Sequence, residues 1–320
     1  MRWFRRIALG LAAWLASAAW AQAPAACPAP PDLAALSRMK PGEGPDHGLL
    51  WRVDKGGHTS WLYGTLHVAR PEWVLPGPKV LAALRASDVI ALEIDLTDTQ
   101  AIKSAMQPAD AQAAARVLDA PRAARIEAAA ARVCAPPAVL KTLSPSMQVI
   151  TLSMLDARRL GLYPELAIDA MLAGTARGSG KRLVALETAA QQMAILKAPS
   201  DSEEGEFIDQ ALTALESGKS DKVMVRLAEG WARGDEQLLV DYPKWCECMD
   251  TEGNRKLMGD MLDGRNGPMA QRIAALHDEG QRVFVGIGAL HVPGPQGVAE
   301  QLRQRGFIVT RVPFANQEKK

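Results

Sequence analysis

The sequence has few aromatic residues and almost no net charge, and both shortages narrow the range of functions. Phe, Trp and Tyr make up 5% of the 320 residues, and 37 basic side chains stand against 36 acidic ones. A nucleic-acid-binding protein usually has a basic excess and aromatic rings on which bases stack. We therefore expect no nucleic-acid partner. The 48% of hydrophobic and 23% of charged residues are typical of a globular chain and exclude a disordered, coiled-coil or collagen-like one.

Long apolar runs are also scarce, and the one at the N-terminus is shorter than a membrane span. A basic start, MRWFRR, leads into an apolar run over residues 7–20, and small residues follow it. A bilayer span takes about 20 residues. This order predicts a signal peptide over residues 1–21, and a periplasmic or secreted protein without a stable membrane anchor. An uncleaved N-terminal anchor is the alternative. Pro24 stands where a lipoprotein signal has a residue such as Leu, which argues against lipid attachment at Cys27.

Cysteine is rare as well, with four residues in the chain: Cys27, Cys134, Cys246 and Cys248. An even number of cysteines in an exported chain predicts disulfides. A bridge between Cys246 and Cys248 would close a very small, strained ring, so each is expected to pair elsewhere. The alternative is a Cys-x-Cys metal site, but no further Cys or His lies near it in the sequence to complete one.

The rest of the chain divides into a Pro/Gly-rich lead-in over residues 22–47, one folded domain over 48–314, and a tail over 315–320. Short apolar segments alternate with long Ala-rich helical ones, which predicts an α/β (α+β) fold: a mixed central sheet with large helical insertions in a single domain. The expected strands are 49–53 and 58–68, which form a hairpin, and 89–94, 182–187, 283–292 and 307–312. The expected helical regions are 76–86, 99–175, 189–280 and 296–306, with a loop at 174–181 and a break at 264–268.

Four of the expected strands end in residues that bind metals. Two close with the same G-x-L-H-V frame, at His67 and His291, and two close with Ala-Leu-Glu, at Glu93 and Glu187. Zn, Mn, Fe and Co accept imidazole and carboxylate ligands. A glutamate at the end of an apolar run is costly to bury unless a metal or an arginine offsets its charge. The set predicts a divalent-metal site; structural histidines and surface carboxylates are the alternative.

The other candidate site residues stand in less specific sequence patterns. Arg265 follows a glycine, where it is placed to stabilise an oxyanion or a substrate carboxylate. Asp169, which follows Glu165, is expected to be a helix surface charge, with a further acid of the site as the alternative. Lys181 follows a Gly-rich segment without the spacing of a phosphate-binding loop. The motifs of nucleophile-elbow serine hydrolases, HExxH metalloproteases and dinucleotide-binding folds do not occur. The remaining histidines are expected to be solvated: His47, His58 and His277.

Taken together, these motifs resemble those of the TraB/GumN/Tiki family over about residues 48–314. The resemblance rests on the two G-x-x-H frames, the Ala-Leu-Glu strands, the Leu-Glu-Thr-x-x-x-Gln segment that begins at Leu186, and the Arg265-Asn266 pair. The closing segment GALHVPGPQGVAEQLRQRGF is especially similar to the bacterial GumN-like branch. The resemblance implies a mixed α/β fold that is distantly similar to erythromycin esterases and ChaN-like proteins.

The resemblance also implies an activity, since animal members of the family are described as metal-dependent proteases with Mn or Co as the metals. Carried onto this chain, it makes His67, His291 and Glu93 the metal ligands, with Zn or Fe as other possible metals. Glu187 would be the general base or a fourth ligand, and Arg265 would steady the oxyanion. The hypothesis is an exported metal-dependent hydrolase that acts on a peptide or protein substrate.

Two other functions remain open at this point. The chain could be a non-catalytic periplasmic binding or assembly protein linked to polysaccharide export, with Trp51, Trp61 and Trp73 as sugar-binding faces; packing in the core is the alternative role for these rings. An esterase or a haem- or iron-handling protein is suggested by distant fold relatives alone. The oligomeric state does not follow from the sequence.

Overall fold

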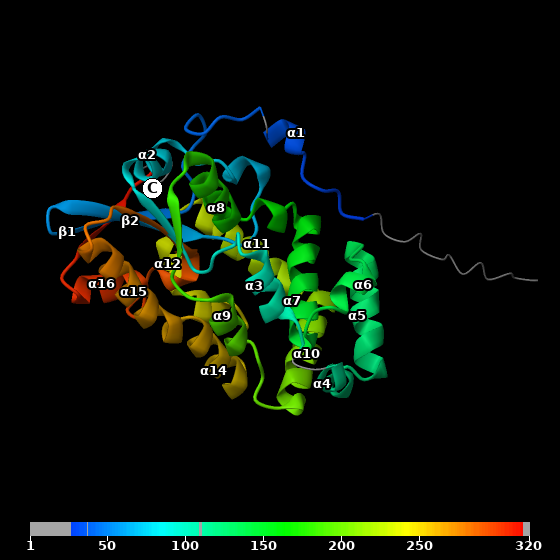
Figure 1. The fold of residues 1–320 in the computed structure, drawn as a ribbon. Helices are drawn as coiled ribbons and strands as arrows, with labels where there is room; N and C mark the ends of the chain where they lie inside the picture. Colours follow the sequence, from blue (N-terminus) through cyan, green and yellow to red (C-terminus); the bar gives the residue numbers. More distant parts are fainter. Residues whose placement is uncertain (1–26, 37, 109–110, 316–320) are drawn as a thin grey trace, which may run out of the picture.

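A six-stranded mixed sheet forms the centre of the protein. The computed structural model describes residues 27–36, 38–108 and 111–315, so the predicted signal peptide lies outside the described residues. The strand order is β4-β3-β5-β2-β1-β6, and Figure 1 shows helices packed around this sheet. The strands are β1 Leu49–Lys55, β2 His58–Thr65, β3 Val89–Leu92, β4 Arg182–Ala185, β5 Val283–Gly288 and β6 Ile308–Val312.

The strand directions divide the sheet into two parts. Strand β1 pairs antiparallel with β2 and with β6, and the hairpin predicted around the Asp54–Gly57 turn is confirmed. Strands β2, β5, β3 and β4 run parallel to one another. The carboxyl ends of four neighbouring strands therefore meet at one edge of the sheet, where residues that follow these strands lie close together.

The helices lie where the sequence predicts helical regions, with two corrections. The segment expected to be a loop at 174–181 continues α8 until Gly180 ends it in a left-handed conformation, φ 66°. The break expected at 264–268 lies slightly earlier in the chain, at Leu262 between α14 and α15. Pro268 lies inside α15. The helices are α1 Leu33–Leu36, α2 Pro78–Ala86, α3 Thr99–Met106, α4 Ala111–Val117, α5 Ala120–Val133, α6 Pro137–Leu140, α7 Pro145–Asp156, α8 Ile168–Ser179, α9 Ala189–Ile195, α10 Asp201–Glu216, α11 Lys219–Ala232, α12 Glu236–Val240, α13 Tyr242–Trp245, α14 Glu252–Met261, α15 Asp263–Asp278 and α16 Val298–Gln304.

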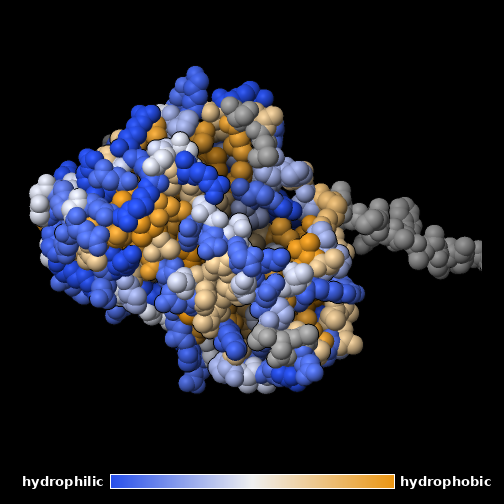
Figure 2. All heavy atoms as spheres, viewed as in Figure 1, coloured by the Kyte–Doolittle hydropathy of each residue, from blue (hydrophilic) through white to orange (hydrophobic). Residues whose placement is uncertain are grey.

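The helical insertion builds an apolar core of its own beside the sheet. Helices α4, α5, α7 and α10 bury a cluster that includes Ile126, Leu152, Ile208 and Leu212. The main core lies on the sheet and contains Trp51 and Trp73, which are 1% and 6% exposed. Trp61 packs against the same core. The three tryptophans near His67 thus contribute to packing. On the face in Figure 2, polar and charged residues surround smaller apolar areas.

Two disulfides cross-link the chain. Cys27 pairs with Cys134 at the end of α5, which fastens the lead-in to the helical insertion. The prediction that Cys246 and Cys248 pair elsewhere is wrong, because they pair with each other at a Cα–Cα distance of 5.1 Å. The intervening Glu247 has a φ of 54°, and this left-handed turn lets two cysteines so close in sequence meet.

The histidines predicted to be solvated are held by the fold. The His47 ring lies 3.2 Å from the Ala232 carbonyl oxygen, and the His58 ring stacks on His277 with centroids 3.8 Å apart. His277 is 1% exposed. Its Nε2 donates to the Lys55 carbonyl and its Nδ1 accepts from the Ser60 hydroxyl. This pattern is that of a neutral imidazole.

This neutral histidine makes stability depend on pH. Burial lowers the pKa of His277 below its usual value, so the unfolded chain binds a proton near pH 6.5 that the folded chain does not take up. The free energy of unfolding should therefore fall below about pH 6.5, by at most about 1.4 kcal/mol per pH unit from this group. Urea denaturation at several pH values checks this, and the decline should be shallower in His277→Gln. Equal slopes in both proteins would contradict it.

Across the described residues, no helix combines the length and the apolarity that crossing a bilayer requires.

Candidate functional site

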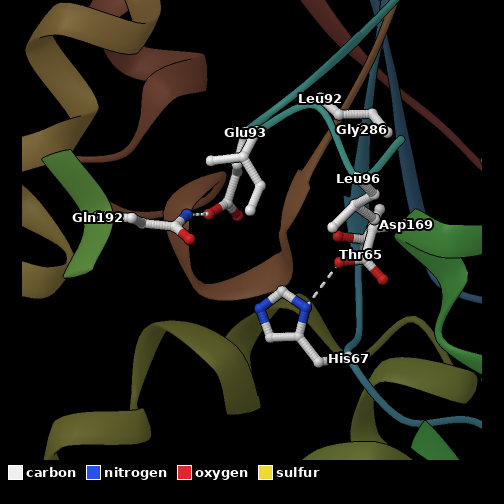
Figure 3. Close-up of a pocket in the computed structure, with 9 residues that line it drawn as sticks. Thr65, His67, Leu92, Glu93, Leu96, Asp169, Gln192 and Gly286 are labelled. Carbon is white, nitrogen blue, oxygen red and sulfur yellow. Dashed lines mark hydrogen bonds and ion pairs between the residues drawn. The ribbon is translucent and has the colours of Figure 1, made fainter. Parts of the chain in front are cut away.

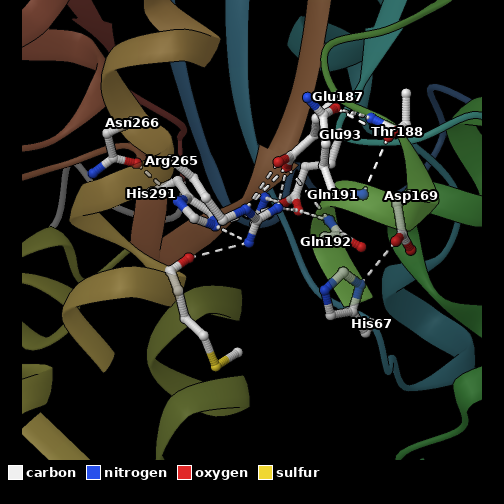
Figure 4. A network of polar contacts seen from close by, with 12 residues as sticks. His67, Glu93, Asp169, Glu187, Thr188, Gln191, Gln192, Arg265, Asn266 and His291 are labelled. Carbon is white, nitrogen blue, oxygen red and sulfur yellow. Dashed lines mark hydrogen bonds and ion pairs between the residues drawn. The ribbon is translucent and has the colours of Figure 1, made fainter. Parts of the chain in front are cut away.

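The five predicted site residues come together at the carboxyl edge of the parallel strands. His67 follows β2, Glu93 follows β3 and Glu187 follows β4, while His291 closes a 3-10 turn, Ala289–His291, directly after β5. The expected strands were longer and included both histidines. In the structure the strands end earlier, and the histidines lie just beyond them. Arg265 reaches the same place from the first turns of α15, and Figure 4 shows its guanidinium between the two glutamates and His291.

Arg265 holds the centre of this network. Its Nε donates to the two carboxylate oxygens of Glu187 at 3.0 and 3.1 Å, and its terminal nitrogen NH2 contacts both Glu187 and Glu93. Its NH1 donates to the Met261 carbonyl oxygen at 3.1 Å and lies 3.1 Å from His291 Nε2. The Arg265 side chain is 10% exposed, and Glu93 and Glu187 are 9% and 13% exposed. The charge of the buried glutamates is thus offset by an arginine.

Glu93 is anchored as an anion. The Gly288 N–H donates to its Oε1 at 2.6 Å, and Gln192 Nε2 donates to its Oε2 at 2.7 Å. Burial acts to raise the pKa of Glu93, but His291, His67 and Arg265 together with the Gly288 N–H outweigh it and lower the pKa to about 2. A carboxylate that stays charged at the base of a pocket is suited to bind a cation or a substrate donor.

His291 is a buried, neutral imidazole. Its Nδ1 pairs with Asn266 Oδ1 at 2.8 Å, and the Asn266 amide in turn donates to the Gln296 carbonyl. Since the Asn266 oxygen can only accept, the proton is assigned to Nδ1, and Nε2 carries the lone pair. Burial lowers the pKa of His291 to about 4.

His67 is held by a residue that the sequence analysis placed on the helix surface. Asp169, in the first turn of α8, bonds His67 Nδ1 through Oδ2 at 2.8 Å, and its side chain is 16% exposed. The prediction of a helix surface charge at Asp169 is therefore wrong. His67 itself is 60% exposed, and the charge of Asp169 raises its pKa to about 9.

Removing the Asp169 charge should lower the pKa of His67. In Asp169→Asn, the pKa of His67 is expected to fall toward the usual value near 6.5, because the carboxylate that favours the imidazolium is gone. An NMR titration of the histidine ring protons measures the change, with His58 in the same spectrum as an internal reference. An unchanged His67 pKa would show that Asp169 does not control it.

The site opens into a cavity of about 190 Å³. Figure 3 shows Glu93 and Gln192 facing each other on one side, and His67 with Asp169 on the other. Arg265 contacts this Glu93, and it also contacts Glu187 and His291. The remaining lining residues are Thr65, Leu92, Ile94, Leu96 and Gly286.

The glycines of the two G-x-L-H frames lie where a Cβ atom would be crowded. A Cβ at Gly64 would lie 3.1 Å from the Ala289 Cα of the other frame. A Cβ at Gly288 would lie 3.1 Å from Glu93 Oε1. The frames thus contact each other through their small residues, which brings the two histidine-bearing turns side by side.

Sequence reasoning missed three supporting residues: Asp169, Gln192 and Asn266. Gln192 belongs to the Leu-Glu-Thr-x-x-x-Gln segment and Asn266 to the Arg-Asn pair, so both stood in motifs without an assigned role. For Asp169, the sequence feature that pointed to a role in the site was its position four residues after another acid, Glu165. Lys181, by contrast, precedes β4 at the opposite edge of the sheet and bonds the Ser87 carbonyl.

A model of the TraB/PrgY/gumN family matches residues 49–311. The chain belongs to this family. No curated protein and no solved structure matches the chain. The family assignment agrees with the resemblance drawn from the strand-end motifs, and the mixed α/β single-domain fold is confirmed.

The donor atoms of this TraB/PrgY/gumN protein suit a metal in their chemistry. His67 and His291 each have Nδ1 held by an oxygen atom, which is the usual outer-shell arrangement of metal-binding histidines. Within the described ranges, however, no three His, Cys, Asp or Glu side chains are already grouped as metal ligands. Arg265 contacts both Glu93 and His291 Nε2, so this guanidinium would have to withdraw from them for a cation to bind.

Proposed function

We propose that this site belongs to an exported metal-dependent hydrolase that cleaves peptide bonds in a peptide or protein substrate. One observation carries the proposal. Two imidazoles, His67 and His291, are each fixed through Nδ1 by an oxygen acceptor, beside a carboxylate that remains charged. Oriented Nε2 atoms and a carboxylate are what a hydrolytic metal site needs. A bound cation would take the place of the Nε2 proton that the raised pKa keeps on His67 at neutral pH.

In this proposal His67, His291 and Glu93 hold one divalent cation, with Mn or Co preferred and Zn or Fe as alternatives. The cation supplies Lewis-acid chemistry, polarising a carbonyl and lowering the pKa of water. Asp169 and Asn266 orient the two imidazole rings. Glu187 takes a proton at Oε2, which accepts the longer of its two bonds from Arg265 Nε. Arg265 donates to the developing oxyanion.

Export is supported by the disulfide between Cys27 and Cys134. Such cross-links form and persist in oxidising compartments such as the bacterial periplasm, and this one joins residues 107 positions apart. The signal peptide proposed over residues 1–21 is consistent with this location. The sugar-binding alternative gains no support, since Trp51 and Trp73 are buried in the core.

The first experiment is to measure metal content after reloading the purified chain with Mn, Co, Zn or Fe. We expect about one bound cation per chain in the wild type, and its loss in both His67→Ala and His291→Ala. His47→Ala is the matched control, since His47 bonds the Ala232 carbonyl and is not part of the site. Hydrolysis of an unfolded protein such as casein should be lost in the same two variants. Metal binding and hydrolysis that survive both substitutions would overturn the proposal.

A further inference from the structure

The disulfide between Cys246 and Cys248 has an unusual setting. Its two cysteines are separated by one residue, whereas the other disulfide spans 107 positions. Cys246 follows α13 and is 3% exposed, while Cys248 is half-buried. An incoming thiol would therefore meet the sulfur of Cys248 first.

The backbone within this small ring is strained. Glu247 has a φ of 54°, a conformation that costs free energy for a residue with a side chain. Among the described residues, Cys134 is the other non-glycine with a positive φ, and it caps the C-terminus of α5, where that conformation is common. Glu247 likewise lies just past a helix C-terminus, directly after the C-cap of α13, and its side chain makes this conformation less favourable than it would be for glycine. Opening the Cys246–Cys248 bond frees this turn to relax.

The same loop stabilises negative charge on one of the two sulfurs. The Cys248 N–H donates to Cys246 Sγ at 3.2 Å. A hydrogen bond of this kind favours a thiolate and makes it a better leaving group. The nearby Glu247 carboxylate, which would oppose that charge, is paired with Lys219 Nζ at 3.1 Å.

From these observations we infer that Cys246 and Cys248 form a thiol–disulfide exchange site for thiols of polypeptide substrates. The thiolate of a substrate cysteine attacks Cys248 Sγ, and the Cys246–Cys248 bond breaks with Cys246 leaving as the thiolate. A second substrate thiolate then attacks the substrate sulfur of this mixed disulfide, and Cys248 leaves as a thiolate. The substrate dithiol is oxidised to a disulfide, and Cys246 and Cys248 are reduced by the same two electrons.

The test compares the two disulfides within one full-length chain. After equilibration in glutathione buffers of graded redox potential, free thiols are alkylated and counted by mass spectrometry. We expect the equilibrium constant for reduction to be at least about tenfold larger for Cys246–Cys248 than for Cys27–Cys134. Poorer access of glutathione to the Cys27–Cys134 bond would not explain such a result, because Cys27 and Cys134 are both exposed. Equal constants, or a more easily reduced Cys27–Cys134, would overturn the inference.

Two variants at position 247 separate backbone strain from charge. Glu247→Gly accepts a positive φ without cost, so it should make the Cys246–Cys248 bond roughly tenfold harder to reduce. Glu247→Ala removes the carboxylate but keeps the strain, so it should stay close to the wild type. An unchanged constant in Glu247→Gly would contradict the strain argument.

The transfer step has its own readout. Mixed with a reduced two-cysteine peptide, the wild type should form about one peptide disulfide per chain, and Cys246→Ser should accumulate none. Failure of the wild type to oxidise the peptide would overturn the exchange activity. The metal proposal is untouched by either result, since it is tested on His67 and His291.

Discussion

Arg265→Met is expected to lower the free energy of unfolding by about 3–5 kcal/mol, because it leaves two buried carboxylates without their cation. Glu93 and Glu187 are 9% and 13% exposed, and the guanidinium of Arg265 contacts both. Urea denaturation near neutral pH measures the loss. Methionine retains much of the volume of the arginine side chain, so the effect reports mainly on charge. Any catalytic activity should be lost as well.

Neutralising the carboxylates provides the control for this result. The triple variant Arg265→Met, Glu93→Gln, Glu187→Gln should recover a large part of the lost stability, because amides are much less costly to bury without a cation than carboxylates. Arg265→Lys should fall between the wild type and Arg265→Met, since an ammonium group cannot reproduce the forked contacts of a guanidinium. A loss below about 1 kcal/mol in Arg265→Met would mean that water or another cation already solvates the site.

Trp231→Ala is expected to cost about 3–5 kcal/mol as well, through the cavity it leaves. Trp231 is fully buried and packs against Tyr63 and Trp73. Its Nε1–H donates to the Gly64 carbonyl oxygen at 2.7 Å, in the first of the two G-x-L-H frames. The substitution therefore removes packing and also leaves a buried carbonyl without its partner.

Trp231→Phe separates the two contributions. It retains most of the apolar volume and loses the hydrogen bond to Gly64, so a smaller cost of about 1–3 kcal/mol is expected from the unpaired carbonyl. Thermal or urea unfolding measures both variants. If Phe costs as much as Ala, packing at this position is not what Trp231 contributes.

Strand-end motifs were sufficient to predict which side chains converge in the candidate site, because the alternation of apolar strands and helices brings strand ends to a common edge regardless of loop conformation. The hairpin, the mixed sheet and the convergence of His67, His291, Glu93 and Glu187 follow from local patterns. The role of Asp169 does not, because its contact with His67 depends on how α8 packs against β3, β4 and β5. The Cys246–Cys248 pairing escaped prediction since ring size alone does not reveal that Glu247 adopts a left-handed turn.

The place of β5 in the sheet has a consequence for the order in which the protein can fold. Strand β5, Val283–Gly288, lies between β2 and β3, although it is nearly the last strand along the chain. As long as β5 is not yet available for pairing, the β1–β2 hairpin and the β3–β4 pair have no shared neighbour, and each presents an unpaired strand edge. The long-range pairings β2–β5 and β3–β5 make for slow folding. A chain that becomes available from its N-terminus onward therefore stays in two separate halves, with His67 in one and Glu93 and Glu187 in the other, until β5 joins them and brings His291 with it.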